Sequence, residues 1–191
     1  SRVATVPGSF AKLSLDKVLS EVLDDLDEMI NSRNARVISD ALPEIEADNT
    51  QMHQLLQNLI VNAIKFVDSD RTPAIRIVSR ILVDESLAAA EFDHRRLELQ
   101  VIDNGIGFEE IYTERIFKPF QRLHSQGDYA GTGIGLALCK RIVERHSGTL
   151  TVESQPGYGS IFTVNLPMTQ VWTENARSLP DLNNEVQQQV S

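Results

Sequence analysis

The sequence predicts a single domain of the α+β class, in which amphipathic helices and β-strands pack around one hydrophobic core. The chain has 191 residues, of which 41% are hydrophobic, so it can bury one sizeable core but not two large ones. Apolar residues recur at helical spacing in three segments. Several shorter segments are rich in β-branched residues that partly alternate with polar ones, as in strands.

Composition excludes several classes of function. The formal net charge is −9 and the isoelectric point is near 4.9, which argues against binding dominated by the phosphate backbone of a nucleic acid. The single cysteine, Cys139, excludes an internal disulfide and fits a reducing compartment. No apolar run approaches the roughly 20 residues of a membrane span and no signal peptide is found, so we expect a cytoplasmic fragment without membrane contact. Because the sequence begins at Ser1 without a methionine, we also expect it to be part of a longer protein.

The first half of the chain contains two predicted amphipathic helices. A short edge strand is expected at 10–14, and apolar residues three and four apart then predict a helix from 15 to 31. A short strand at 35–39 and a connection at 41–43 follow. The second helix is expected from about 49 to 66, capped by Asp48 or Asn49. Its core-facing arc consists of Met52, Leu55, Leu56, Leu59, Ile60, Ala63 and Phe66.

The opposite side of this second helix carries a polar stripe. Asn58, Asn62 and Lys65 are four and three residues apart, so they lie together on one side. Asparagine is only a middling helix former, and two of them one turn apart suggest a binding role. Ordinary solvated polar residues are the alternative interpretation.

A carboxylate is predicted on the inward face of a strand end. Segments 75–83 and 97–103 both have a strand pattern, and the second ends in an aspartate. Leu97, Leu99 and Val101 share one face of it, and Asp103 is the next residue on that face. A buried carboxylate without a partner costs several kcal/mol. Asp103 therefore needs a hydrogen-bond donor from the protein, from water or from a ligand.

A glycine-rich turn into a helix is the strongest candidate for an anion site. A long polar loop at 109–130 contains a basic cluster of Arg115, Lys118, Arg122 and His124 and leads into the glycine-rich stretch 131–136. The first N–H groups of a helix lack internal partners and lie at the positive end of its dipole, and glycine lets a phosphate approach them. For this stretch alone, a flexible loop with helix-entry glycines is the alternative.

The remainder of the chain reads as a helix, two strands and a tail. The helix after the glycines buries Cys139 as a core residue, and Gly148 is expected to cap its C-terminus. Strands are predicted at 149–153 and 160–166 with a turn at 155–159 between them. Residues 168–191 are polar and rich in Gln and Asn, which predicts a tail or linker without a core of its own.

Four sequence boxes stand in a fixed order. They are Asn58-Leu-Ile-Val-Asn62-Ala-Ile-Lys65-Phe66, Asp103-Asn-Gly105-Ile-Gly107-Phe108, Ile116-Phe-Lys-Pro-Phe120 and Gly131-Thr132-Gly133-Ile134-Gly135-Leu136. Together they resemble the N, first glycine, F and second glycine boxes of the catalytic and ATP-binding domain (HATPase_c) of sensor histidine kinases in two-component systems. This domain is part of the GHKL superfamily, with gyrase, mismatch-repair ATPases and heat-shock chaperones. A dinucleotide-binding site fits less well, because its glycine pattern is spaced differently and directly follows a strand.

The resemblance covers about 13–167 and implies a fold and a domain organisation. The implied fold is the Bergerat or GHKL fold, a two-layer α/β sandwich of a mixed sheet with helices on one face and a mobile ATP lid. Residues 1–12 would be the end of a preceding dimerisation hairpin or linker, and 13–167 the catalytic and ATP-binding domain. Residues 168–191 would be a flexible tail or a linker.

The resemblance also implies roles for single residues. Asn62 would supply its amide oxygen to Mg²⁺, a hard cation that prefers oxygen ligands, while Asn58 and Lys65 would face the phosphates of ATP. Asp103 would accept a hydrogen bond from the adenine amino group, and Ser160 would support Asp103.

The lid would complete the nucleotide site. Hinged through Phe117 and Phe120, it would bring Arg122 to the γ-phosphate, so the catalytic roles fall to Asn58, Lys65 and Arg122. In the glycine boxes, Gly105 and Gly107 would let the backbone approach the base. The expected nucleotide contacts also include Phe66, Phe108, Gly131, Thr132, Gly133, Ile134, Gly135, Leu136 and Ser160.

Two departures from the family pattern bear on the reaction. In hydrolytic relatives, a glutamate four residues before the magnesium-binding asparagine acts as general base, whereas Asn58 here cannot take a proton at neutral pH. This favours phosphoryl transfer over steady ATP hydrolysis. None of the four histidines, His53, His94, His124 and His146, lies in the acceptor motif of the family. The resemblance thus implies that the phosphoacceptor histidine lies on a domain of the same protein that is missing here, with a response regulator receiver domain downstream.

Three other functions are alternatives to a histidine kinase. They are a nucleotide-binding regulatory module that has lost kinase activity, a hydrolytic ATPase of the same superfamily, and a scaffold without a ligand. The intact boxes argue against the first, Asn58 against the second, and the convergence of Asp103, Asn62 and the glycines against the third.

Overall fold

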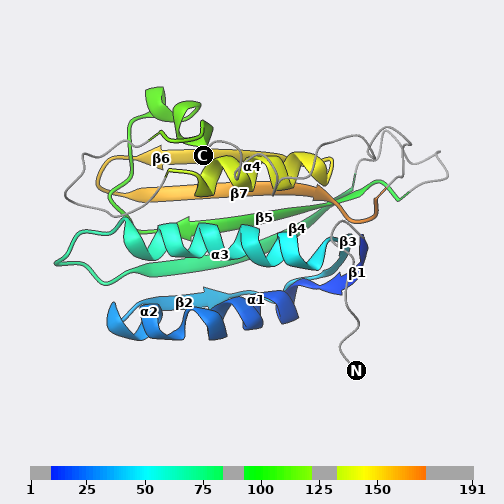
Figure 1. Ribbon diagram of the computed structural model, residues 1–191, viewed down its shortest axis with the longest axis horizontal. Helices are drawn as coiled ribbons and strands as arrows, with labels where there is room; N and C mark the ends of the chain where they lie inside the picture. Colours follow the sequence, from blue (N-terminus) through cyan, green and yellow to red (C-terminus); the bar gives the residue numbers. More distant parts are fainter. Residues whose placement is uncertain (1–9, 84–92, 122–132, 171–191) are drawn as a thin grey trace, which may run out of the picture.

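A mixed five-stranded sheet forms one layer of the domain. The computed structural model describes residues 10–83, 93–121 and 133–170. The sheet has the order β2-β4-β5-β7-β6 (Figure 1). Its strands, in chain order, are β2 (Arg36–Ser39), β4 (Ala74–Val83), β5 (Arg95–Asp103), β6 (Thr149–Gln155) and β7 (Gly159–Pro167). Only the β2–β4 pair is parallel; β4–β5, β5–β7 and β6–β7 are antiparallel.

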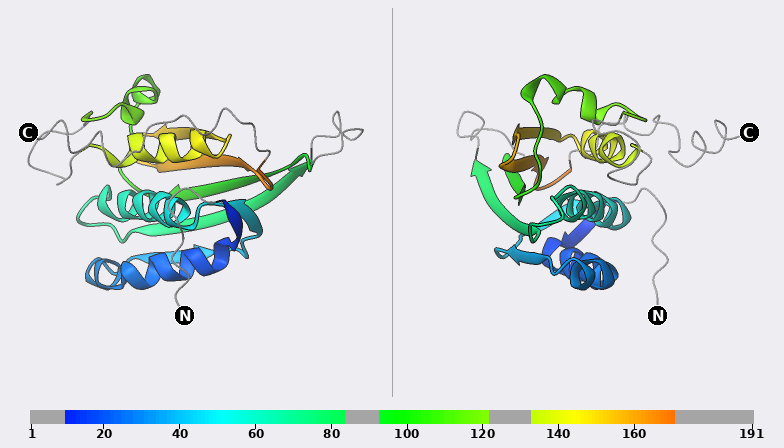
Figure 2. Two further views of the ribbon diagram at one scale, coloured as in Figure 1. Left: turned by 45° about the vertical axis from the view of Figure 1, so that its right-hand side comes forward. Right: turned by 90° about the vertical axis from the view of Figure 1, so that its left-hand side faces the viewer.

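The helices form the second layer and cover one face of this sheet (Figure 2). They are α1 (Leu15–Asp25), α2 (Asp27–Ser32), α3 (Asn49–Lys65) and α4 (Gly135–Arg145), with the short 3₁₀ turns η2 (Glu110–Tyr112) and η3 (Arg115–Phe117). A small antiparallel sheet of β1 (Ala11–Ser14) and β3 (Glu44–Ala47) lies beside them. The predicted two-layer α+β sandwich is confirmed. Within the described ranges, no helix is both long and apolar enough to span a membrane.

Helix boundaries follow local sequence, with one correction. Ser14 caps α1 by accepting a hydrogen bond from Lys17 N (3.4 Å), and Asp48 caps α3 by accepting from Gln51 N (3.0 Å). The single helix expected at 15–31 is instead two helices that meet at Leu26, whose φ and ψ are −97° and 5°. Leu26 is buried, and its backbone still bonds to Val22 and Ile30. The break is therefore a local bend that keeps Leu26 in the core.

Two other sequence predictions needed revision. The strand β3 was missed, because its burial depends on pairing with β1, where Leu13 lies opposite Ile45. Gly148 is not the residue that reverses the chain after α4, since Ser147 takes the left-handed conformation there (φ 56°). A Cβ on Gly148 would lie 2.4 Å from the Asn165 carbonyl oxygen, so glycine is required at 148 for close packing against β7.

The inward face of the sheet carries the core and ends in a polar row. Register places Val101, Phe162 and Val152 side by side on β5, β7 and β6, and all three are buried. The next residues on the same face, two positions away along each strand, are Asp103 on β5, Ser160 on β7 and Ser154 on β6, and they also lie side by side. These three residues are called the polar row below. The hydrophobic core thus ends at this row, where polar side chains replace apolar ones on the inward face of the sheet.

A buried histidine joins α4 to the start of α3. His146 is 0% exposed; its Nδ1 donates to the Ile142 carbonyl oxygen (2.7 Å) and its Nε2 accepts from Asp48 N (3.1 Å). The Phe10 ring packs edge-on against it, with centroids 4.6 Å apart. Burial lowers the pKa of His146 below its ordinary value, with opposing contributions from Ile142 and Asp48. The neutral ring is therefore the form that fits, because Nε2 must be an acceptor.

Replacing this histidine should destabilise the domain most at alkaline pH. His146→Ala removes the hydrogen bond that His146 Nε2 accepts from Asp48 N and opens a cavity, which should lower the free energy of unfolding by about 2–3 kcal/mol. A lowered folded-state pKa means that the stabilisation by His146 is complete above its unfolded value, about 6.5, and is lost as pH falls below it. Urea unfolding at pH 8 and pH 5.5 should therefore show a larger loss at pH 8. His53→Ala, at a partly exposed site paired with Asp25, is the matched control. An equal loss in the free energy of unfolding for His146→Ala and His53→Ala would refute the stabilising role of His146.

Candidate active site

Asp103 of the polar row presents a carboxylate with one anchored oxygen and one open oxygen. Its Oδ1 accepts from Gly105 N (2.8 Å) and Ser160 N (3.1 Å). In the described part of the chain, Oδ2 has no hydrogen-bond partner. Burial raises the pKa of Asp103 to about 6, although the two N–H donors lower it. The inward carboxylate predicted from the strand pattern is confirmed, and its open oxygen can accept a hydrogen bond from a ligand.

The glycines beside Asp103 are required by close packing against other segments of the protein. A Cβ on Gly105 would lie 2.5 Å from the Phe66 carbonyl oxygen and 2.8 Å from Asp103 Oδ1. Gly107 has φ 61°, and a Cβ there would lie 2.0 Å from the Gln155 carbonyl oxygen. The space beside both glycines is therefore filled by protein atoms, mostly of the backbone. Their expected role, close approach of the backbone to a base, stays a prediction.

Ser160 supports Asp103 through its backbone, and a second serine supports Ser160. The Ser160 side chain does not bond to Asp103 but lies 2.9 Å from Ser154 Oγ. Ser154 Oγ also accepts from Phe108 N (3.0 Å) and donates to the Gly159 carbonyl oxygen (3.1 Å). Sequence reasoning missed Ser154. The signal was present, because Ser154 follows Leu150 and Val152 on the inward face of β6.

The middle of α3 meets the N-terminus of α4. A Cβ on Gly135 would lie 2.8 Å from Asn58 Oδ1, so the Asn58 amide sits directly beside the first residue of α4. The amide is oriented by its own Nδ2, which donates to the Gln54 carbonyl oxygen (2.8 Å). Among the residues that the structure describes, no side chain caps α4, in contrast to α1 and α3. The first N–H groups of α4 are thus available for an anion next to Asn58.

The C-terminal end of α3 meets the loop after Asp103. The Phe66 carbonyl oxygen accepts from Ile106 N (2.8 Å), which joins the end of α3 to the first glycine box. Lys65 Nζ lies 4.6 Å from the centre of the Phe66 ring. Asn62 is half-buried and lies one turn from Asn58 on the same helix. The predicted polar stripe therefore connects the Asp103 end of the site to the α4 end.

The two ends of the site are separated by a distance that suits an elongated ligand. From Asn58 to Phe66 the helix rises by about 12 Å at 1.5 Å per residue. An acceptor carboxylate lies at one end and an uncapped helix N-terminus at the other, with Asn62 midway along α3. A molecule with a hydrogen-bond donor at one end and a polyanion at the other matches this arrangement.

The segment that approaches α4 contains both phenylalanines of the third box. Ile116 and Phe117 are buried, and Lys140 on α4 lies 5.8 Å from the centre of the Phe117 ring. Phe120 is 64% exposed and has a left-handed φ of 61°; its N–H donates to the Gly133 carbonyl oxygen (3.1 Å). Phe117 is thus an anchor and Phe120 is open to solvent. Arg122, Gly131 and Thr132 lie outside the described residues, so their expected roles stay predictions.

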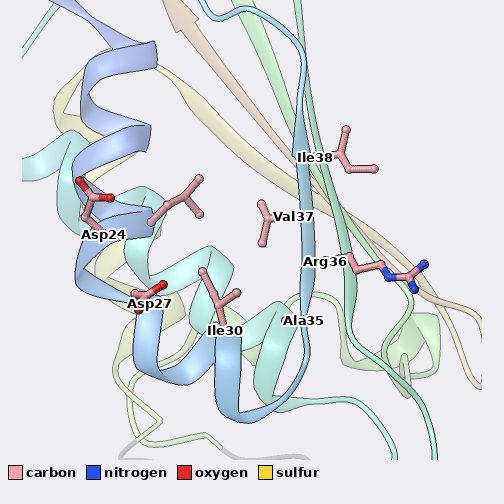
Figure 3. A pocket seen from close by; sticks show the side chains of 8 residues that line it. Asp24, Asp27, Ile30, Ala35, Arg36, Val37 and Ile38 are labelled. Atoms are coloured by element: carbon pink, nitrogen blue, oxygen red, sulfur yellow. The ribbon is translucent and has the colours of Figure 1, made fainter.

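Other chemistry-bearing features lie apart from this site. In the described ranges, no group of three or more His, Cys, Asp or Glu residues could hold a metal ion, so a cation here would need amide oxygens and ligand oxygens. Cys139 is buried, and burial raises the pKa of its thiol to about 12, which confirms a packing role. An open groove between the α1–α2 segment and β2 is lined by residues such as Asp24, Asp27 and Val37 and contains none of the site residues (Figure 3).

Comparisons with known proteins show which family this chain resembles. The family described as "Histidine kinase-, DNA gyrase B-, and HSP90-like ATPase" matches residues 47–170. Cyanobacterial phytochrome A of Nostoc sp. (strain PCC 7120) is 42% identical over 168 residues, which is 88% of this chain and 20% of the phytochrome. The adaptive-response sensory kinase SasA of Prochlorococcus marinus is 35% identical over 173 residues, 88% of this chain and 42% of that kinase. The chain thus spans less than half the length of these relatives.

Solved structures resemble the fold over most of the chain. The nucleotide-free catalytic domain of histidine kinase ThkA superposes with a TM-score of 0.66 at 27% identity, covering 84% of this chain and 97% of that domain. ThkA in complex with the response regulator protein TrrA superposes with a TM-score of 0.62 at 26% identity, covering 84% of this chain and 42% of that kinase.

Proposed function

The chain belongs to the family of histidine kinase-, DNA gyrase B- and HSP90-like ATPases, and we propose that it is the ATP-binding catalytic domain of a protein-histidine kinase in a two-component system. Nucleotide use follows from the family. The observation that carries the proposal is the pairing of two ends about 12 Å apart along α3, the open Asp103 oxygen and the uncapped N-terminus of α4 beside Asn58. Adenine would lie at the first and the phosphates at the second.

Each end of the site contributes a different interaction. Asp103 Oδ2 accepts a hydrogen bond from the adenine amino group, which satisfies the buried carboxylate. The N–H groups of Gly135 and Leu136 and the Asn58 amide hold the phosphates. Lys65 adds positive charge along the same helix. Arg122, on the proposed lid segment, would complete the site from the other side.

A magnesium ion is part of the proposal, and its expected ligand fits. Asn62 offers a hard amide oxygen between the two ends of the site, and the absence of a carboxylate cluster in the described ranges leaves phosphate and water oxygens as the other ligands. When bound, Mg²⁺ would offset the negative charge of the phosphates.

The proposed reaction is phosphoryl transfer to an imidazole on another domain of the same protein. The imidazole nitrogen attacks the γ-phosphorus, the bond to the bridging β,γ-oxygen breaks, ADP leaves, and the imidazole N–H proton is released to solvent. This chain orients the nucleotide and exposes the γ-phosphate. It has no glutamate at position 58 to activate water. We propose a response regulator receiver domain as the next acceptor, residues 13–167 as the catalytic unit and a cytoplasmic setting.

Calorimetry followed by a transfer assay tests the proposal. The chain should bind a non-hydrolysable ATP analogue, more tightly with Mg²⁺ than without, and Asn62→Ala should remove most of that difference. Thr50→Ala, at an exposed position on the first turn of α3, is the matched control. Mixed with a histidine-bearing dimerisation hairpin and labelled ATP, the chain should produce an acid-labile phosphohistidine. No binding would overturn the proposal, binding without transfer would indicate a regulatory module, and steady hydrolysis without an acceptor would indicate an ATPase.

A further inference from the structure

The polar row contains one hydroxyl that contacts two of the segments around Asp103. Ser154 Oγ accepts from Phe108 N at 3.0 Å, which holds the loop that follows Asp103. The same oxygen lies 3.1 Å from the Gly159 carbonyl oxygen and 2.9 Å from Ser160 Oγ, which holds the start of β7. One side chain on β6 therefore bridges two backbone segments that are distant in sequence.

These two segments supply both hydrogen-bond donors to Asp103. Gly105 N comes from the loop that Ser154 holds through Phe108, and Ser160 N comes from the strand start that Ser154 holds through Gly159. Both donate to the same oxygen, Oδ1, so together they fix the rotation of the carboxyl group. The direction of the open Oδ2 depends on that rotation, and so does the hydrogen bond that Oδ2 can form.

The contacts of Ser154 suit a positioning role better than a role in core packing. Its side chain is part-buried at the edge of the hydrophobic core, where apolar burial contributes little to stability. A serine hydroxyl has one donor and two acceptor sites, and here Phe108 N, Gly159 O and Ser160 Oγ occupy them. Alanine at 154 would leave two segments without their common partner and Phe108 N without an acceptor.

We propose that Ser154 is a positioning residue for base recognition, which orients Asp103 through Gly105 and Ser160 and thereby sets the preference of the site for adenine over guanine. The inference rests on the proposed function, in which Asp103 faces the base. Adenine presents an amino group to an acceptor at this position, whereas guanine presents a carbonyl oxygen. A carboxylate that is held in one rotation discriminates between them, and one that can rotate away does so less well.

The test is nucleotide affinity measured by calorimetry with ATP, GTP and ADP. Ser154→Ala should weaken ATP binding about tenfold and reduce the ratio of ATP to GTP affinity by a similar factor. The ratio of ATP to ADP affinity should not change, because it reports the phosphate end of the site. Ser154→Thr keeps the hydroxyl and should restore the preference for ATP over GTP. Thr151→Ala, exposed on the outer face of the same strand, should bind like the unsubstituted chain.

Each outcome separates this inference from the proposed function. If the unsubstituted chain does not bind ATP, the proposed function fails. If it binds ATP and Ser154→Ala lowers the affinity for ATP, GTP and ADP by the same factor, or leaves the ratio of ATP to GTP unchanged, Ser154 is only structural and the inference is overturned. Urea unfolding of both variants shows whether they are folded. If Ser154→Ala does not fold, the ratio of ATP to GTP affinity is compared between Ser154→Thr and Ser154→Cys, which differ in hydrogen-bonding strength at similar size. An equal ratio in these two variants overturns the inference.

Discussion

Asp103→Asn should weaken ATP binding by about 10- to 100-fold, the loss expected when a charge-assisted hydrogen bond is removed from a buried site. The structure dictates how the new amide must sit. Gly105 N and Ser160 N both donate to Oδ1, so the amide oxygen has to take that place. The amide nitrogen then occupies the position of Oδ2 and presents donors to the adenine amino group, which is itself a donor. Guanine has a carbonyl oxygen there, so the preference for ATP over GTP should shrink or invert.

The same substitution should make the unliganded domain more stable at neutral pH. The folded-state pKa of Asp103 is about 6, above its ordinary value of 3.8, because burial disfavours the charged form. For a carboxyl group with a raised pKa, the folded state is penalised as pH rises from about 4 to about 6, and the penalty is complete above that window. Asparagine removes this penalty, which should raise the free energy of unfolding by about 1–3 kcal/mol at pH 8 and by less at pH 5. A carboxylate kept at this cost is consistent with a role in binding.

Calorimetry and urea unfolding at pH 5 and pH 8 check both halves of this prediction. An exposed acid that makes an ordinary surface ion pair, Glu44, supplies the control as Glu44→Gln, for which neither ATP affinity nor stability should change much. Unchanged ATP affinity in Asp103→Asn would remove the role that Asp103 has in the proposed site. A less stable variant at pH 8 would show that Asp103 stabilises the fold itself.

Residues whose direction depends on local periodicity could be predicted from the sequence. Asp103 follows three inward-facing apolar residues on one strand, and the structure confirms its direction because strand side chains alternate strictly. Asn58 and Asn62 share a side of α3 for the corresponding helical reason. The same alternation would have placed Ser154 on the inward face of β6, but nothing in its local sequence shows which segments it joins.

Features that depend on how elements approach each other could not be predicted. Contact between Gly135 and Asn58 depends on the distance between two packed helices, and the packing of Gly107 against Gln155 depends on where two loops meet. The left-handed residue after α4 is Ser147, and the neighbouring Gly148 is instead required by close packing against β7. In each case a glycine was recognisable, but its reason was set by tertiary contacts.

The two glycine boxes should therefore respond oppositely to the same substitution. At Gly107 a Cβ would meet the Gln155 backbone at 2.0 Å with φ at 61°, so Gly107→Ala should lower the free energy of unfolding by about 3 kcal/mol or more. At Gly135, within the described part of the chain, a Cβ would meet only the end of the Asn58 side chain, which can rotate. Alanine is also a better helix former than glycine, so Gly135→Ala should keep or raise stability, by up to about 1 kcal/mol.

Function should fall in Gly135→Ala even though the fold is intact. Rotation of Asn58 away from the new methyl group breaks its bond to the Gln54 carbonyl and moves its amide from the N-terminus of α4, where the phosphates are proposed to lie. We expect phosphotransfer to a histidine-bearing hairpin to drop at least about tenfold, since small displacements of positioning groups have large effects on rate. Urea unfolding and transfer rates measured on Gly107→Ala and Gly135→Ala test this. Gly157→Ala is the control for a left-handed glycine in open space, since no atom of the described residues lies within 4 Å of the added Cβ. Full transfer activity in Gly135→Ala would mean that the contact between Asn58 and α4 does not serve the phosphates, and a loss of stability there would mean that the second glycine box is structural like the first.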